Sequence, residues 1–100
     1  MEQRKITVVF TEKAATNIAS VAWYIAEKGY PDTAQNYLER LYAFGRSLAN
    51  FPDKYPVSNH PVYKKHGMHC AVFEHTYIFI YRLVKNNLII YSVIHCKRLK

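Results

Sequence analysis

Four side chains in the second half of the chain could together act on a phosphodiester: His69, Arg82, His95 and Lys97. Histidine titrates near neutral pH, so it can take a proton from a 2′-hydroxyl or give one to a leaving oxygen. An arginine guanidinium offers a charged fork to the developing phosphorane. His69, Arg82 and His95 are therefore candidate catalytic residues of a metal-free ribonuclease. The alternative is that Arg82 and His95 are structural or bind an acidic partner.

The stretch Tyr77–His95 predicts the β-hairpin that positions two of these residues. Two runs of aromatic and β-branched residues flank Asn86-Asn87, a dipeptide suited to a type I′ turn. With that loop, Arg82 lies opposite Tyr91. Alternation then places Arg82, Tyr91 and His95 on one face, and a nearly all-apolar set faces the core. Four residues, or roughly 13 Å, would still separate Arg82 from His95 along the strands.

A third strand, His69–Phe73, is expected upstream of the hairpin. If its loop is His75-Thr76, His69 lies opposite Arg82 and becomes the closer catalytic partner. A slip of one residue would turn this strand over and move His69 to the other face.

Composition bounds the class of protein. The chain has 100 residues, enough for one domain spanning 1–100, and 50% are hydrophobic. Its formal net charge of +7 favours nucleic acid or an acidic protein as partner. No apolar run approaches the roughly 20 residues that span a bilayer, and the N-terminus lacks a signal-peptide core, so we expect a cytoplasmic protein. The five histidines are scattered without zinc-site spacing, so neither a metal nor a cofactor is predicted.

The first half predicts one strand and two helices. Lys5–Phe10 is β-prone, and Thr11 is a plausible N-cap for a helix that ends near Gly29. Pro31 marks its stop, and a capping box from Asp32 opens a second helix. The matched apolar stripes predict an antiparallel helical hairpin. Gly45 either allows close approach of the first helix or is simply tolerated.

The second half predicts a loop followed by strands. Residues 51–61 hold three prolines and read as a loop, and the strand region begins near Val62, with Lys64 and Lys65 at its start. The order is therefore β-α-α-β-β-β. The expected fold is a two-layer α+β domain, with the helical hairpin on one face of a mostly antiparallel four-stranded sheet.

Several motifs, in order along nearly the whole chain, resemble the RelE/ParE superfamily of bacterial type II toxin–antitoxin toxins, also known as plasmid-stabilisation proteins. The strand Tyr77–Arg82 is similar to the family's Tyr-x-Ile-x-Tyr-Arg, and Val93–Arg98 to its closing Val-x-His-x-x-Arg. The helical segments Trp23–Ala26 and Ala34–Leu38, followed by Leu48–Pro52, resemble the family's helical hairpin and its Leu-x-x-x-Pro.

The resemblance implies a toxin neutralised by an antitoxin whose extended tail wraps it. RelE-like members cleave mRNA in the ribosome, whereas ParE-like members inhibit DNA gyrase. The two long helices resemble the ParE branch. Where the family often carries an arginine before the Tyr-x-Ile-x-Tyr strand, this chain has His69, Cys70 and Ala71, a departure that disfavours RNA cleavage.

We therefore expect a ParE-like gyrase inhibitor that forms a hetero-oligomer with an acidic antitoxin. The alternatives are a ribosome-dependent mRNA endonuclease and a non-toxic module that retains antitoxin binding. The residues expected to bind the target or the antitoxin are Lys64, Lys65, Arg82, Tyr91, His95, Lys97 and Arg98.

Overall fold

The two long helices begin and end at residues whose local chemistry explains the boundaries. In the computed structural model, which describes residues 5–52, 54–57 and 60–98, Thr11 is extended and its Oγ1 accepts the amide proton of Ala14. The predicted N-cap of α1 (Glu12–Glu27) is thus confirmed. Gly29, with φ of 93°, follows its end.

The second helix starts earlier than the capping box predicted. Helix α2 (Pro31–Ser47) has Pro31 in its first turn and Tyr30 as an N-cap that makes no side-chain bond. Proline suits this position, because the first amides of a helix have no intrahelical partner and its φ is already helical. Pro31 therefore opens the second helix as well as ending the connection from the first.

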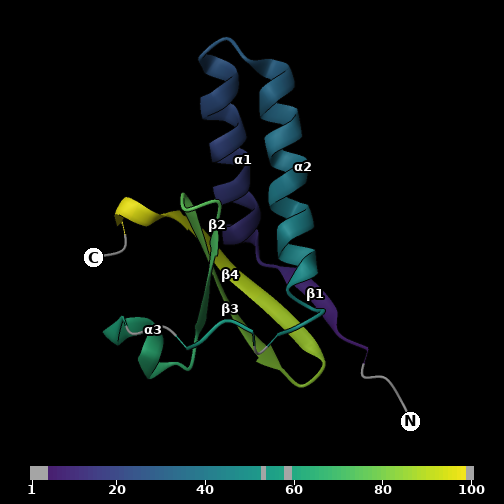
Figure 1. The fold of residues 1–100 in the computed structure, drawn as a ribbon, viewed down its shortest axis with the longest axis vertical. Helices are drawn as coiled ribbons and strands as arrows, with labels where there is room; N and C mark the ends of the chain where they lie inside the picture. The colour runs from purple at the N-terminus through teal and green to yellow at the C-terminus, as the bar shows by residue number, and fades with distance from the viewer. Residues whose placement is uncertain (1–4, 53, 58–59, 99–100) are drawn as a thin grey trace.

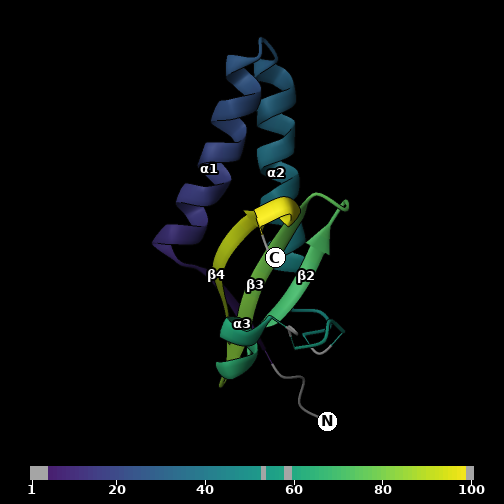
Figure 2. The same ribbon diagram turned by 90° about the vertical axis from the view of Figure 1, so that its left-hand side faces the viewer.

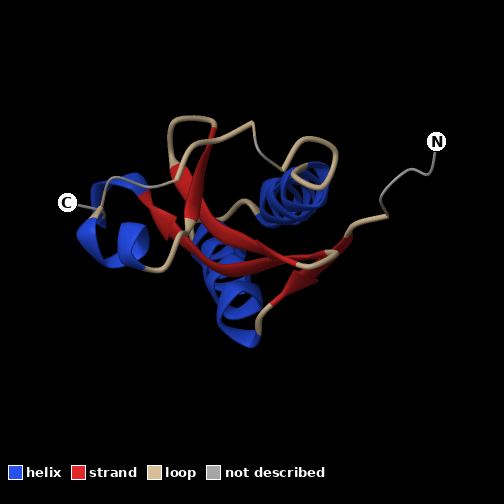
Figure 3. Cartoon of the chain, turned by 90° about the horizontal axis from the view of Figure 1, so that it is seen from below, coloured by secondary structure: helices blue, strands red, loops and turns tan. Residues whose placement is uncertain are grey.

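Four strands form one sheet in the order β1-β4-β3-β2. Strand β1 runs parallel to β4, and the other two pairings are antiparallel. Figure 3 shows the twist of this sheet from below. The predicted α+β fold is confirmed. The strands are β1 (Thr7–Phe10), β2 (His69–Phe73), β3 (Tyr77–Val84) and β4 (Asn87–His95).

A short helix, α3 (Pro61–Lys65), replaces the start of the strand region predicted near Val62. Pro61 stands in its first turn, and the amide of Met68 donates to the carbonyl of Tyr63 after its end. A 3₁₀ turn, η1 (Cys96–Arg98), ends the described chain. Both α3 and η1 lie on the side of the sheet away from α2 (Figures 1 and 2). Lys64 and Lys65 are therefore helical residues and not strand residues.

The main core forms between α2 and one face of the sheet. Phe44 packs against Phe73 and Phe79, with ring centroids 5.1 and 5.0 Å away. A Cβ on Gly45 would come within 2.6 Å of the Phe10 ring and 2.9 Å of Ile90. Gly45 thus permits a close approach, but of α2 to the sheet and not of one helix to the other.

Helix α1 runs beside the part of β4 that β1 does not reach. The parallel pairing ends at Ile90. Beyond it, the Thr11 hydroxyl donates to the Tyr91 carbonyl and the Val93 amide donates to the Asn17 side-chain oxygen. The side chains of Thr11, the N-cap, and Asn17, in α1, therefore satisfy backbone groups that a longer β1 would have paired. The far ends of α1 and α2 project beyond the sheet (Figure 1).

Candidate functional site

The β3–β4 hairpin carries an irregularity that decides where its polar residues point. Its turn is Lys85-Asn86, with Lys85 at φ of 57°, and Arg82 pairs with Ile89. The predicted turn, Asn86-Asn87, and the predicted pairing of Arg82 with Tyr91 are both wrong. The error is an even number of residues, so the faces assigned near the turn still hold.

A β-bulge then reverses the faces of the second half of β4. The register shifts between Ile80 and Tyr81, where Tyr91 is the extra residue on β4. Past the bulge Tyr77 pairs with His95 and Phe79 with Val93. Val93 enters the core, and His95 shares the helix-covered face with Tyr77. The prediction that Arg82, Tyr91 and His95 share a face is therefore wrong.

His69 also lies on the helix-covered face. It pairs with Tyr81, one residue from the predicted partner Arg82, and this slip turns β2 over. Its ring stacks on Tyr81 with centroids 5.3 Å apart, and its Nδ1 lies 2.7 Å from the carbonyl oxygen of Tyr55. These contacts give His69 a structural role, because they join β2 to the loop that follows α2.

The three candidate catalytic residues do not converge on one point. Arg82 is exposed on the opposite face of the sheet from His69 and His95. The two histidines pair with Tyr81 and Tyr77, four residues or roughly 13 Å apart along β3. General acid–base cleavage needs its groups within hydrogen-bond reach of one phosphate. This arrangement does not provide that geometry.

His95 instead lines a groove of about 640 Å³ between α1 and the end of β4. Its ring meets Tyr77 edge-on at 5.3 Å, and its Nδ1 accepts the amide proton of Lys97 at 3.1 Å. The neutral ring in this arrangement carries its proton on Nε2. We call this feature the α1–β4 groove; its lining residues are Asn17, Ser20, Val21, Tyr24, Tyr77, Val93, Ile94, His95 and Lys97.

The α1 side of this groove carries none of the residues predicted to bind the target or the antitoxin. Tyr24 is 60% exposed and Trp23 is 67% exposed, although aromatic side chains usually bury much of their surface. Their position off the apolar stripe of the helix was the available signal. Lys28 lies over the Tyr24 ring, 5.1 Å from its centroid.

An aromatic cluster joins α2 to the β2–β3 turn. Tyr37 contacts Phe73 and Tyr77 at 5.9 and 6.1 Å, and Arg40 lies over the Tyr37 ring and pairs with Glu74. Burial raises the pKa of Tyr37 above its ordinary value of 10.0; Tyr77 adds to the rise and Arg40 opposes it. The cluster holds Tyr77, and through it one wall of the α1–β4 groove.

The predicted binding residues divide between different surfaces. Lys64 and Lys65 are exposed on α3, and Arg82 is exposed on the face of β3 turned away from α2. Lys97 is exposed in η1, and the backbone of Arg98 belongs to the same turn. The half-buried Tyr91 forms the bulge, and His95 lines the groove. The structure therefore separates His95 from Lys64, Lys65 and Arg82.

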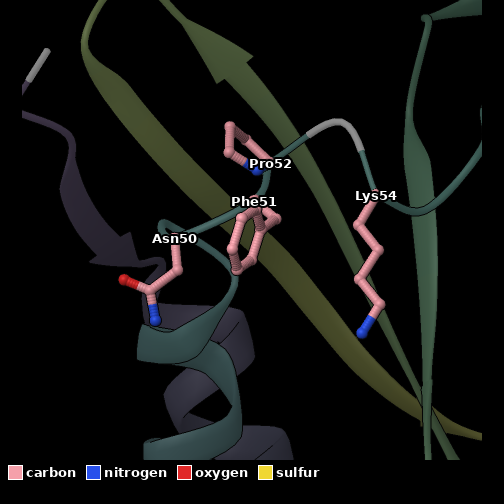
Figure 4. Close-up of a pocket in the computed structure, with 4 residues that line it drawn as sticks. All are labelled: Asn50, Phe51, Pro52 and Lys54. Carbon is pink, nitrogen blue, oxygen red and sulfur yellow. The ribbon is translucent and has the colours of Figure 1, made fainter.

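A second hollow, of about 540 Å³, lies at the loop after α2 and is lined by Asn50, Phe51, Pro52 and Lys54 (Figure 4). Phe51 is 70% exposed there, while the Pro52 carbonyl accepts the Tyr81 hydroxyl proton. Lys54 is the one charged side chain among these four residues. They contain no acid–base pair, so they offer surface for binding and not for catalysis.

Comparison with known proteins identifies the class of toxin to which this fold belongs. The family model for the ParE toxin of type II toxin–antitoxin systems, parDE, matches residues 8–100. The chain therefore belongs to this family.

A similar solved structure is described as the chromosomal ParDE TA system from P. aeruginosa. The TM-score is 0.79 at 14% identity, with 93% of this chain and 98% of that chain covered. An identity this low shows a shared fold. A comparison with curated proteins finds no match. Within residues 5–52, 54–57 and 60–98, no helix is both long and apolar enough to cross a membrane.

Proposed function

We propose that this chain inhibits bacterial growth by binding DNA gyrase. Membership of the ParE toxin family supports this function over most of the chain. The observation that favours binding over cleavage is the separation of His69, Arg82 and His95 across two faces of the sheet. A toxin that works by binding needs no general base, so this separation is compatible with its function.

The proposed partner that neutralises the toxin is an acidic antitoxin. The net charge of +7 favours such a partner, and the similar solved structure is described as a toxin–antitoxin system. On this proposal the antitoxin contacts the α1–β4 groove at His95 and Lys97, near Tyr91 and Arg98. Lys64, Lys65 and Arg82 are proposed to contact the target, which is gyrase together with its DNA substrate. Both interactions would take place in the cytoplasm.

Induction of the chain alone in bacteria tests the proposed function. We expect growth arrest within minutes, relaxed plasmid DNA and intact transcripts. Plasmid topology on chloroquine gels and transcript length on northern blots give both readouts from one culture. The antitoxin is tested in the same strain by co-expression of a candidate, which should restore growth.

The alternatives give different outcomes in the same experiment. Rapid transcript cleavage that the exposed variant Arg82→Ala abolishes, with plasmid topology unchanged at first, would support a nuclease and reject gyrase as the target. Unaltered growth, with the protein folded and expressed, would indicate that the chain is a non-toxic interaction module.

A further inference from the structure

The net charge of the chain lies entirely in its second half. Residues 1–53 carry six Lys or Arg and six Asp or Glu, and are neutral. Residues 54–100 carry eight Lys or Arg and a single acidic residue, Glu74, together with all five histidines. A charge asymmetry of this size between the two halves of a small domain is typical of a surface that meets a polyanion.

The fold gathers part of this charge on one side of the sheet. Lys64 and Lys65 are exposed on α3, which lies on the side away from α2 (Figures 1 and 2). Arg82 is exposed on the same face of the sheet, in the strand beside β2. Beyond the other end of β4, η1 carries the exposed Lys97. Six residues separate Ile89, the partner of Arg82, from His95, a distance of roughly 20 Å. We call Lys64, Lys65 and Arg82 the basic face.

Glu74 does not offset this charge. It stands in the β2–β3 turn and forms an ion pair with Arg40, which reaches it from α2. The exposed Arg40 guanidinium also lies over the ring of Phe73, 5.6 Å from its centroid. The acidic residue of this half is thus matched by a cation from the neutral half, and the lysines and arginine of the basic face keep their excess charge.

We propose that the basic face binds the phosphate backbone of duplex DNA. A rigid polyanion with a phosphate every 3.4 Å or so along each strand offers separate contacts to the lysines of α3 and to the arginine of β3. Ile78 and Ile80, on the same face, are only 7% and 1% exposed, so they present no open apolar slot to a peptide. Among the described residues of the sheet, the exposed apolar side chains on this face are single valines on three strands, Val9, Val72 and Val84, and α3 adds the exposed Val62.

Single-stranded nucleic acid suits this face less well. Proteins that hold single strands stack the bases on exposed aromatic rings. Among the residues whose placement is described, the strongly exposed aromatic side chains are on the helical hairpin and in the loop after it: Trp23, Tyr24, Tyr30 and Phe51. The basic face thus offers charge without stacking platforms, which favours backbone contacts to a duplex.

This inference deepens the proposed function, because gyrase acts on duplex DNA. The choice of DNA, and not RNA, as the bound duplex rests on the proposed function. A toxin that holds the DNA near gyrase would engage the enzyme together with its substrate. DNA binding can nevertheless be measured without gyrase, so failure of one proposal is distinguishable from failure of the other.

Fluorescence anisotropy with a labelled 24-base-pair DNA duplex of arbitrary sequence, over a series of salt concentrations, tests the inference. The test variant replaces Lys64, Lys65 and Arg82 by Gln. The matched control replaces three exposed cations of the neutral half, Lys5, Lys13 and Arg46, by Gln. Both variants lose three charges, so total charge cannot explain a difference between them. Circular dichroism and thermal melting confirm that each variant is folded.

We expect the unmodified chain to bind with an affinity that falls steeply with salt. Each lost phosphate contact lowers the slope of log K against log salt by about 0.9, so the basic-face variant, which lacks three cations, should lose about 2–3 units of slope. Its affinity for the duplex should be at least about tenfold weaker than that of the unmodified chain. The control should stay within about threefold of the unmodified chain.

Three results would overturn the inference. The first is equal loss of binding in the two variants, which would show a net-charge effect. The second is tighter binding of a labelled polyglutamate peptide than of the duplex, which would make an acidic protein the occupant. The third is the absence of salt-dependent DNA binding. If gyrase inhibition persists in the third case, the proposed function survives without this contact.

Discussion

The helical hairpin and the strand-rich second half of the chain are built by different rules. The hairpin is regular, with two helices of 16 and 17 residues, and belongs to the half whose charges cancel. Within the described residues, the second half contains a β-bulge and three non-glycine residues at positive φ, Glu74, His75 and Lys85. It also holds all of the net charge. Regular packing and the proposed polyanion contacts thus occur in different parts of the molecule.

This difference assigns separate roles to the two regions. The hairpin supplies apolar contacts that set the position of the sheet, and one wall of the α1–β4 groove. The second half supplies the excess positive charge, on strands whose turns and β-bulge determine which face each side chain occupies. Substitutions at the contacts between the regions should therefore affect folding, whereas exposed cations of the second half should affect binding.

The largest expected effect comes from filling the contact between α2 and the sheet. Gly45→Val places a side chain where a Cβ alone would lie 2.6 Å from Phe10, whose ring is itself held against Tyr42 at 4.8 Å. We expect a loss of about 2–3 kcal/mol in the free energy of unfolding, measured by urea denaturation. Ala43→Val, at an exposed site of the same helix, should cost under about 1 kcal/mol. Equal losses would contradict this close approach.

A smaller effect should follow from breaking the bond between α1 and β4. Asn17→Ala removes the acceptor of the Val93 amide, which belongs to a residue only 3% exposed. The expected loss is about 1–2 kcal/mol in the same unfolding experiment. Thr16→Ala, at the exposed neighbouring position, is the control and should change stability little. Faster hydrogen exchange of the Val93 amide in Asn17→Ala would show that the loss of stability comes with loss of this hydrogen bond.

A gain in stability is expected at the β2–β3 turn. His75 is exposed with φ of 59°, a conformation that glycine adopts without steric cost. His75→Gly should raise the melting temperature, by an amount that corresponds to roughly 0.5–1 kcal/mol. His66→Gly, where φ is −100°, should lower it. If both variants lose stability, the turn is not strained in the way its backbone indicates.

The smallest effect is a pH dependence at the aromatic cluster. Because burial raises the pKa of Tyr37, the folded chain retains that proton at a pH where the unfolded chain has lost it. The free energy of unfolding should therefore fall as the pH rises above about 10. Tyr37→Phe should reduce this fall, and Tyr24→Phe, at an exposed position, is the matched control. Urea denaturation at several alkaline pH values measures the slopes; indistinguishable slopes for the two variants would remove Tyr37 as the cause.

Periodic apolar patterns made the helical hairpin predictable from the sequence. Irregularities of a single residue in the strands made the positions of the candidate site residues unpredictable. The end of α1 was predicted to within two residues, from the N-cap Thr11, the apolar stripe and Gly29. In the sheet, the alternation along β3 was predicted correctly, but His95 was assigned to the wrong face. The bulge at Tyr91 lies just beyond the end of the β1 pairing, where the Thr11 hydroxyl donates to the Tyr91 carbonyl, and these are tertiary contacts. No local pattern around Tyr91 indicates them.

His69 and α3 show the same limit. A loop of uncertain length preceded β3, and one residue of slip moved His69 from beside Arg82 to a stack on Tyr81. The prolines of residues 51–61 predict a loop, yet proline also suits the first turn of a helix, which is where Pro61 stands. The candidate cations were therefore identified by type, but their division between the basic face and the α1–β4 groove required the fold.

A supercoiling assay with purified gyrase tests whether this chain inhibits the enzyme. Relaxed plasmid, ATP and gyrase are incubated with increasing amounts of the purified chain, and the topoisomers are resolved on agarose. If the chain inhibits gyrase, supercoiling falls as the chain is added, while mRNA in a parallel translation extract stays intact. Full supercoiling at every concentration, together with cleaved mRNA in the extract, would contradict gyrase inhibition by this chain.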